Sequence, residues 1–283
     1  MARRLRNFMY DQDTLNKPKF FEIISQGERS RIPLIVHIPH SSIFIPENER
    51  LTFCLSDQEL KEELLLMTDR LTDDLFSKAV ELGGTLFVNR VSRFVFDPER
   101  FPDDESEPMA IKGMGAVYTK TSRGNPLRVN NFSLDDRRRV MDQYFNPYSK
   151  ALEEEVTKTL KIFGKCFILD GHSFPSIPQP YENPDSNRPD ICIGFNSFHA
   201  SDDIVTKIEN ICKSNNYASG RNEPFSGSYV PLKYFQKESK IKSLMIEVRR
   251  GTYMNESEGV ANKQYEQTKN LISEVMKEIV STL

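Results

Sequence analysis

The sequence predicts an α/β fold in which one central sheet is covered by helices on both faces. Short apolar runs rich in β-branched residues alternate along the chain with amphipathic stretches at helical spacing. No internal repeat and no low-complexity linker divides the 283 residues. A chain of this length can bury a sizeable core, so its size demands no disulfide framework.

Six apolar runs have the length and composition of β-strands. They are Leu34–Ile38, Thr85–Val88, Arg93–Phe96, Cys166–Leu169, Asp190–Phe195 and Ser243–Val248. Such short strands, separated by helical stretches, favour a buried sheet.

Four stretches have apolar residues at helical spacing. They are Ser56–Leu82, which stops at a Gly-Gly pair, Leu134–Ile162, which we expect to be broken near Pro147, Asp202–Lys213 and Asn262–Leu283. The segments Phe101–Arg128 and Phe174–Arg188 are rich in Pro, Gly, Asn and Asp. We expect these two segments to be loops that rim a cleft beyond the strand ends.

We expect one domain over residues 31–283, preceded by a loosely ordered arm over residues 1–30. The opening residues lack the apolar stretch of a signal peptide, and no run is long enough to span a bilayer, so the cytoplasm is the expected compartment. The four cysteines are widely spaced, which argues against a disulfide scaffold or a zinc ribbon. We expect Cys166 and Cys192 to be buried strand thiols.

The charge balance argues against a nucleic-acid or membrane partner. With 38 basic and 41 acidic residues, the net charge of -3 attracts neither nucleic acid nor anionic lipid, and no basic patch interleaved with aromatic residues occurs. A small molecule is the expected partner. The sequence leaves the oligomeric state open.

Two histidines and a glutamate lie at or just beyond apolar runs. His40 follows the first predicted strand, His172 follows Asp170-Gly171, and Glu247 lies in the last strand. Imidazoles and a carboxylate at strand ends can hold a metal ion and activate water. His37 lies three residues before His40 and points to the other face of a strand, so we expect His40 to be the ligand and His37 to be structural.

Further charged residues are candidates for the same site. Asp69 and Asp73 are four apart, so either can supply a carboxylate ligand, and a solvated acidic helix face is the alternative. Glu247 in an apolar strand needs an arginine partner or a catalytic role. Arg93 and Arg100 have guanidinium groups that can bind carboxylates, and Arg93 can instead pair with Asp97.

The fourth histidine, His199, lies in a polar stretch, so we expect it at the surface.

Seven segments in order resemble the N-formylglutamate amidohydrolase (deformylase) family. They are PHSS (39–42), TDRLTDDLF (68–76), NRVSRFVFDPER (89–100), FNPYSKAL (145–152), LDGHS (169–173), PDICIGF (189–195) and IEVRRGTYM (246–254). The resemblance implies a zinc-carboxypeptidase-like three-layer sandwich with a mixed, mostly parallel sheet. It also implies one divalent metal, with zinc expected, and hydrolysis of an N-formyl amide, most simply N-formyl-L-glutamate, to formate and glutamate, as in histidine breakdown.

The same resemblance implies the roles of individual residues. His40, Asp69 and His172 are the implied metal ligands, with Asp73 as the alternative to Asp69, and Glu247 is the implied catalytic carboxylate. Arg93, Arg100 and Arg250 are the implied contacts of an acidic substrate.

Three positions depart from the family pattern. Glu99 stands where the family usually has asparagine, Ser149 where a histidine is frequent, and His37 where a small residue is common. These departures bear on the pocket for the glutamate side chain. Two alternatives also stay open. One is another zinc-dependent acyl-amino-acid amidase or carboxypeptidase-like hydrolase, and the other is a non-catalytic anion-binding α/β protein.

Overall fold

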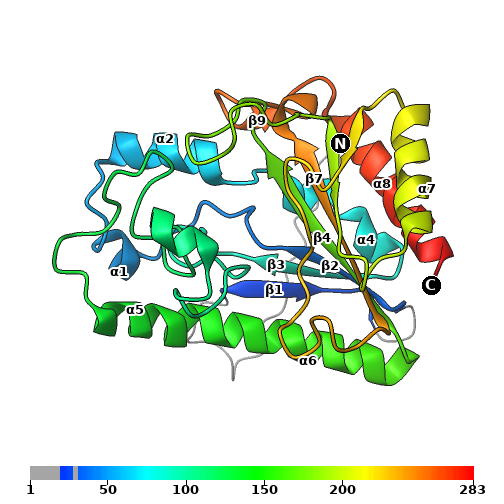
Figure 1. The fold of residues 1–283 in the computed structure, drawn as a ribbon, viewed down its shortest axis with the longest axis horizontal. Helices are drawn as coiled ribbons and strands as arrows, with labels where there is room; N and C mark the ends of the chain where they lie inside the picture. Colours follow the sequence, from blue (N-terminus) through cyan, green and yellow to red (C-terminus); the bar gives the residue numbers. More distant parts are fainter. Residues whose placement is uncertain (1–19, 28–30) are drawn as a thin grey trace, which may run out of the picture.

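A seven-stranded sheet runs through the middle of the molecule in a computed structural model that describes residues 20–27 and 31–283 (Figure 1). Its strand order is β1-β3-β2-β4-β7-β5-β6. The strands are β1 (Phe21–Ile24), β2 (Leu34–Ile38), β3 (Thr85–Asn89), β4 (Cys166–Phe174), β5 (Ile191–Gly194), β6 (Ser219–Arg221) and β7 (Ile241–Arg249). Strands β3, β2, β4 and β7 are parallel, whereas β1 and β5 run antiparallel to β3 and β7. The predicted mixed, mostly parallel sheet is confirmed.

Helices cover both faces of this sheet. They are α1 (Glu47–Arg50), α2 (Asp57–Met67), α3 (Thr72–Leu75), α4 (Lys78–Glu81), α5 (Leu134–Val140), α6 (Asn146–Phe163), α7 (Asp202–Ser214) and α8 (Tyr265–Ser281). Short 3-10 turns lie at η3 (Pro108–Lys112) and η5 (Arg250–Thr252), a π-helical turn at η4 (Met141–Phe145), and a small hairpin at β8 (Met254–Asn255) and β9 (Val260–Ala261). Figure 1 shows α5 and α6 along one side of the sheet and α7 and α8 on the other, which makes the three predicted layers.

The strand sequences account for the two cores. In β2, Leu34, Val36 and Ile38 face the core shared with α7 and α8, whereas Ile35 faces the core shared with α6. All five residues of β2 are buried, because the strand is internal and covered on both sides. Polar residues within such strands therefore indicate a specific role.

The long helix predicted over Ser56–Leu82 is wrong as a single element. The capping box at Ser56 starts α2, which ends at Met67, and α3 and α4 follow as single turns. Leu71 has a left-handed φ of 68°, which no helix interior accommodates. This break matters for the position of Asp69.

The strand predicted over Arg93–Phe96 is also wrong, because this segment is a turn in which the Val95 N–H donates to the Ser92 carbonyl. The predicted helix over Leu134–Ile162 is confirmed as α5 and α6, with the π-helical turn η4 joining them just before Pro147. The predicted loop over Phe101–Arg128 has little regular structure, yet it buries side chains in the α6 core, namely Met114, Ala116, Val117, Tyr118 and Leu127.

The predicted N-terminal arm contains an edge strand, because β1 pairs with β3 from Phe21 to Ile24. The rest of that prediction, over residues 1–19 and 28–30, lies outside the described residues. Among the helices of residues 20–27 and 31–283, none combines the length and the apolar character needed to cross a membrane.

Candidate active site

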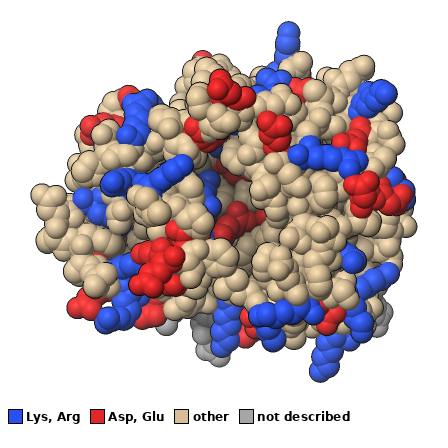
Figure 2. Space-filling model, in the orientation of Figure 1, with Lys and Arg blue, Asp and Glu red and all other residues tan. Residues whose placement is uncertain are grey.

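The carboxyl ends of β2, β4 and β7 meet at one edge of the sheet and open into a cavity of about 740 Å³. Figure 2 shows this face hollowed near its middle, with acidic side chains visible inside the hollow. The predicted rim loops contribute Phe101, Pro102, Tyr181 and Glu182 to its lining. The cavity lies where ligands bind in open α/β sheets.

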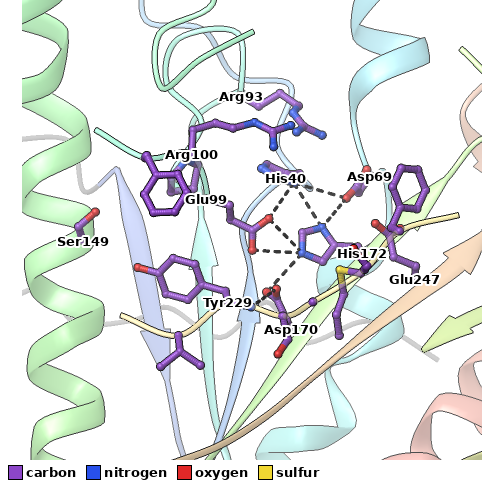
Figure 3. Close-up of a pocket in the computed structure, with 18 of the residues that line it drawn as sticks. His40, Asp69, Arg93, Glu99, Arg100, Ser149, Asp170, His172, Tyr229 and Glu247 are labelled. Atoms are coloured by element: carbon purple, nitrogen blue, oxygen red, sulfur yellow. Dashed lines mark hydrogen bonds and ion pairs between the residues drawn. The ribbon is translucent and has the colours of Figure 1, made fainter. Parts of the chain in front are cut away.

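Two histidines and an aspartate bring three donor atoms together in this cavity (Figure 3). The Nδ1 atoms of His40 and His172 lie 3.3 Å apart. Asp69 Oδ2 lies 3.2 Å from His172 Nδ1 and 3.7 Å from His40 Nδ1. Ligands of a tetrahedral zinc ion, with bonds of about 2.0–2.2 Å, are separated by roughly 3.3 Å. The three atoms therefore fit the donor set of one divalent metal ion.

Asp69 reaches this position because α2 ends just before it. Its backbone N–H donates to the His40 carbonyl instead of continuing the helix, and the Thr72 hydroxyl donates to the Asp69 carbonyl. Asp73, the alternative, accepts from Arg90 at the surface and is a third exposed. The structure thus brings Asp69, and not Asp73, to the two histidines.

Asp97 orients the His40 ring. The His40 Nε2–H donates to Asp97 Oδ1 at 2.8 Å, which leaves Nδ1 facing the cavity. Asp97 is fully buried and also accepts from Arg93 and Tyr118 at 2.7 and 2.9 Å. Although burial alone would raise it, the charges of Arg93, His40 and Arg100 hold the pKa of the Asp97 carboxyl well below its ordinary value. A buried carboxylate behind a metal-facing histidine fixes its tautomer.

Two carboxylates face the other nitrogen of His172. Its Nε2 lies 3.3 Å from Asp170 Oδ1 and 3.2 Å from both oxygens of Glu99. Asp170, two residues before His172 in β4, is therefore one of the groups that can orient its ring. Asp170 also accepts from His37 Nδ1 at 2.8 Å and from the backbone N–H of Tyr229. Gly171 separates Asp170 from His172, and a Cβ there would lie 2.6 Å from the end of the Ile38 side chain and 3.1 Å from the Phe76 ring, so a larger residue would force both to shift.

Glu247 lies directly beside His172, since the two residues are paired in the register of β4 and β7. Its side chain lines the cavity, and its Oε2 is buried without a hydrogen-bond partner among the described residues. Burial raises the pKa of the Glu247 carboxyl to about 7, and the nearby Asp69 charge adds to the rise while His172 opposes it. A carboxyl with this pKa can exchange a proton near neutral pH.

The three predicted arginines all line the cavity but differ in their available donors. Arg250 donates to Asp69 Oδ1 at 2.9 Å and to the carbonyls of Leu66 and Ser173. Arg100 makes only a 3.6 Å contact with Asp97, and its Nε has no hydrogen-bond partner in the described part of the chain. Arg250 therefore holds Asp69, whereas Arg100 has donors left for a ligand.

Two predictions outside the site can also be compared with the structure. His199 is fully buried, so the surface prediction is wrong: its Nδ1 donates to the Ile241 carbonyl and its Nε2 accepts from the Gln236 N–H. Cys166 and Cys192 are buried in strands as predicted.

Two residues that contact the histidines of the site, Asp97 and Glu99, could not be assigned to it from the sequence. Asp97 appeared only as a partner of Arg93, and Glu99 only as a departure from the family pattern. Both lie in the turn after residue 92, where the Glu99 N–H donates to Asp97 Oδ1. The Asp and Pro residues in FDPER (96–100) are the sequence signal for a turn in this segment.

Comparisons with known proteins identify the family of this chain. The family model described as N-formylglutamate amidohydrolase matches residues 32–254. A relative from Pseudomonas aeruginosa named N-formylglutamate deformylase is 28% identical over 266 residues, covering 90% of this chain and 95% of that protein. A protein of the same name from Pseudomonas putida is 28% identical over 236 residues, covering 81% and 85%.

Two solved structures share the fold. The crystal structure of N-formylglutamate amidohydrolase from Ralstonia eutropha JMP134 superposes with a TM-score of 0.78 at 23% identity, covering 93% of this chain and 97% of that one. The structure of a gene product from Agrobacterium tumefaciens gives a TM-score of 0.64 at 18% identity, covering 94% and 96%.

Proposed function

Because the chain belongs to the N-formylglutamate amidohydrolase family, we propose that it hydrolyses N-formyl-L-glutamate to formate and glutamate. The observation that carries this proposal is the triangle of two imidazole nitrogens and one carboxylate oxygen beside the buried carboxyl of Glu247. A pair of histidines with a purely structural role would require neither the carboxylate of Asp69 beside it nor the buried carboxyl of Glu247.

The proposed ligands are His40 Nδ1, Asp69 Oδ2 and His172 Nδ1, and the proposed metal is zinc. Two nitrogens and one oxygen form a donor set that zinc prefers, and they leave a coordination position open. When bound, the ion lowers the pKa of a water molecule and polarises the formyl carbonyl. Asp97 and Asp170 support this role by holding the distal nitrogens of the two rings.

Glu247 is the proposed general base and acid. Its carboxylate accepts a proton from the water that attacks the formyl carbon, and the carboxyl then donates that proton to the departing amine nitrogen. In the metal-free chain the pKa of this carboxyl is about 7, and a bound cation would lower it, so the group can be ionised near neutral pH and can still return the proton that it accepts. Its register position next to His172 supports this role, because both side chains line the same cavity.

Arg93 and Arg100 are the proposed contacts for the substrate carboxylates. Arg93 is anchored by Asp97 and by the Tyr118 hydroxyl, so its guanidinium is held in one orientation. Arg100 lies one residue from Glu99 and keeps donors available. Arg250 makes no direct substrate contact in this scheme, because its donors already bond to Asp69 and to two backbone carbonyls. Its role is to hold the carboxylate of Asp69 in place.

The cytoplasm is the proposed compartment. All four cysteines are free, and three of them are buried apart from one another, as suits a reducing environment. The proposed substrate is a small acidic molecule.

The decisive experiment measures formate release from a panel of N-formyl amino acids with and without added zinc. We expect Glu247→Gln to retain zinc while losing about 10²–10⁴-fold of turnover. Glu153→Gln removes a carboxylate that lines the same cavity and pairs with Lys233, so it should leave turnover near wild type. Zinc-dependent release confined to another formyl amino acid would reject the substrate, and undiminished turnover in Glu247→Gln would reject the base.

A further inference from the structure

A second cluster of metal-binding side chains lies beside the first. His37, Asp170 and Glu99 each offer one donor atom, and these atoms lie within 4.8 Å of one another. His37 Nδ1 is 2.8 Å from Asp170 Oδ1 and 3.5 Å from Glu99 Oε1. The other carboxylate oxygen of Glu99 points toward the first cluster, 3.8 Å from His40 Nδ1 (Figure 3). Glu99 thus stands between two groups of donors.

Among the described residues, no lysine or arginine pairs with the two carboxylates of this cluster, whose charged partners are histidines alone. Asp69 pairs with Arg250 and Asp97 with Arg93, whereas Asp170 and Glu99 have only histidines within ion-pair distance among the described residues. Asp170 is buried, and the Glu99 side chain is only 16% exposed. Buried charges in proteins are paired or coordinate metals, since an unpaired one is costly.

The formal charge of the cavity supports the same conclusion. Immediately around the two clusters, five carboxylates and three arginines leave a charge of -2 when Glu247 is ionised and the histidines are neutral; the residues are Asp69, Asp97, Glu99, Asp170, Glu247, Arg93, Arg100 and Arg250. One divalent ion cancels this charge. With one ion bound, the site would have no positive charge left for a substrate that carries two carboxylates. A second divalent ion would balance the two negative charges of that substrate.

We propose that His37, Asp170 and Glu99 hold a second divalent cation, with Glu99 bridging it to the first. The inference rests on the first metal centre of the proposed function. One imidazole nitrogen and carboxylate oxygens suit zinc, manganese or cobalt. His37 is prepared for this role, because its Nε2 is 2.7 Å from the Tyr148 hydroxyl, to which it can donate while Nδ1 faces the carboxylates. Paired metal sites bridged by a carboxylate clamp both oxygens of a reacting group.

The alternative arrangement is a hydrogen-bonded cluster without a second ion. In that case His37 Nδ1–H donates to Asp170, and His172 Nε2–H donates to Glu99. The two arrangements differ in metal content, which can be counted without any measurement of activity.

The experiment counts zinc ions on the full chain. Metal-stripped protein is titrated with Zn²⁺, dialysed, and analysed for bound metal by mass spectrometry, with every variant in a Cys54→Ser background because Cys54 is the exposed thiol. We expect two ions per chain for wild type and one for Glu99→Gln. Glu153→Gln removes a carboxylate from the same cavity, outside both clusters, and should retain two.

His37→Gln provides a second variant and should also bind one ion while Asp170 and Glu99 remain. One ion in both wild type and Glu99→Gln would overturn this inference and leave the proposed function standing. No bound ion in wild type would overturn both. Two ions retained in Glu99→Gln, with the same affinities, would exclude Glu99 as the bridge and sink the proposal.

Discussion

Replacing Glu247 by glutamine should make the metal-free protein more stable. In the folded chain the pKa of this carboxyl rises from 4.5 to about 7, chiefly because the group is buried. Below pH 4.5 the acid is protonated in both the folded and the unfolded chain. Between pH 4.5 and 7 only the unfolded chain ionises, so the free energy of unfolding falls. At about 1.4 kcal/mol per pKa unit, the loss approaches roughly 3 kcal/mol above pH 7.

The assay is urea denaturation of metal-stripped wild type and Glu247→Gln at several pH values. The stability gain of the variant should be small at pH 4.5 and should grow to as much as about 3 kcal/mol at pH 8. Added zinc should reduce the gain, because a nearby cation favours the ionised carboxylate. Glu153→Gln, with its side chain 39% exposed and paired with Lys233, should show no such rise. A gain that is equal at pH 4.5 and pH 8 would refute the reasoning.

Three further predictions concern the rest of the site. Asp97→Asn should weaken zinc binding by about 10- to 100-fold and destabilise the fold by about 3–5 kcal/mol, because Arg93 loses its buried partner; chelator competition and denaturation measure both, and wild-type zinc affinity would contradict it. Arg100→Ala should raise KM for N-formyl-L-glutamate more than it lowers kcat, and steady-state kinetics with an unchanged KM would exclude this contact. In wild type, kcat/KM should fall about ten-fold per pH unit once the pH drops below the pKa of Glu247, which is about 7 or lower, since Glu247 must be ionised to accept a proton. A pH profile without this fall on the acidic side would reject Glu247 as the base.

The residues of the site that lie on strands or at their ends, namely His40, His172 and Glu247, could be predicted from the sequence. Apolar runs identify β2, β4 and β7, and polar residues near the carboxyl ends of these runs are candidates to face the edge of the sheet. Parallel neighbours bring those ends together, so His40, His172 and Glu247 were expected in one place. The structure places the side chains of all three on one cavity.

The residues of the site that lie in turns could not be predicted in the same way. Helical periodicity places Asp69 and Asp73 on one helix face. In the structure the helix is interrupted here: Leu71 has a left-handed φ, and the Asp69 N–H donates to the His40 carbonyl. That hydrogen bond joins segments far apart in sequence, and no local pattern reports it. Likewise, β-branched and aromatic residues around Arg93 suggested a strand, whereas their burial comes from packing of a turn against the α6 core.

The two halves of the site consequently have different structural origins. His172 and Glu247 are opposite one another in the β4–β7 ladder, and a slip of one residue would turn Glu247 toward the core of α7 and α8. The hydrogen bonds that stabilise the centre of the sheet therefore also position the base. Asp69 and Asp97 lie in irregular segments instead, held by turn hydrogen bonds, by backbone contacts to His40 and Ala116, and by the pairing of their carboxylates with Arg250 and Arg93. Changes in those segments should impair metal binding and the substrate contacts of Arg93 and Arg100 before they disturb the base, because Glu247 is positioned by the β4–β7 ladder instead.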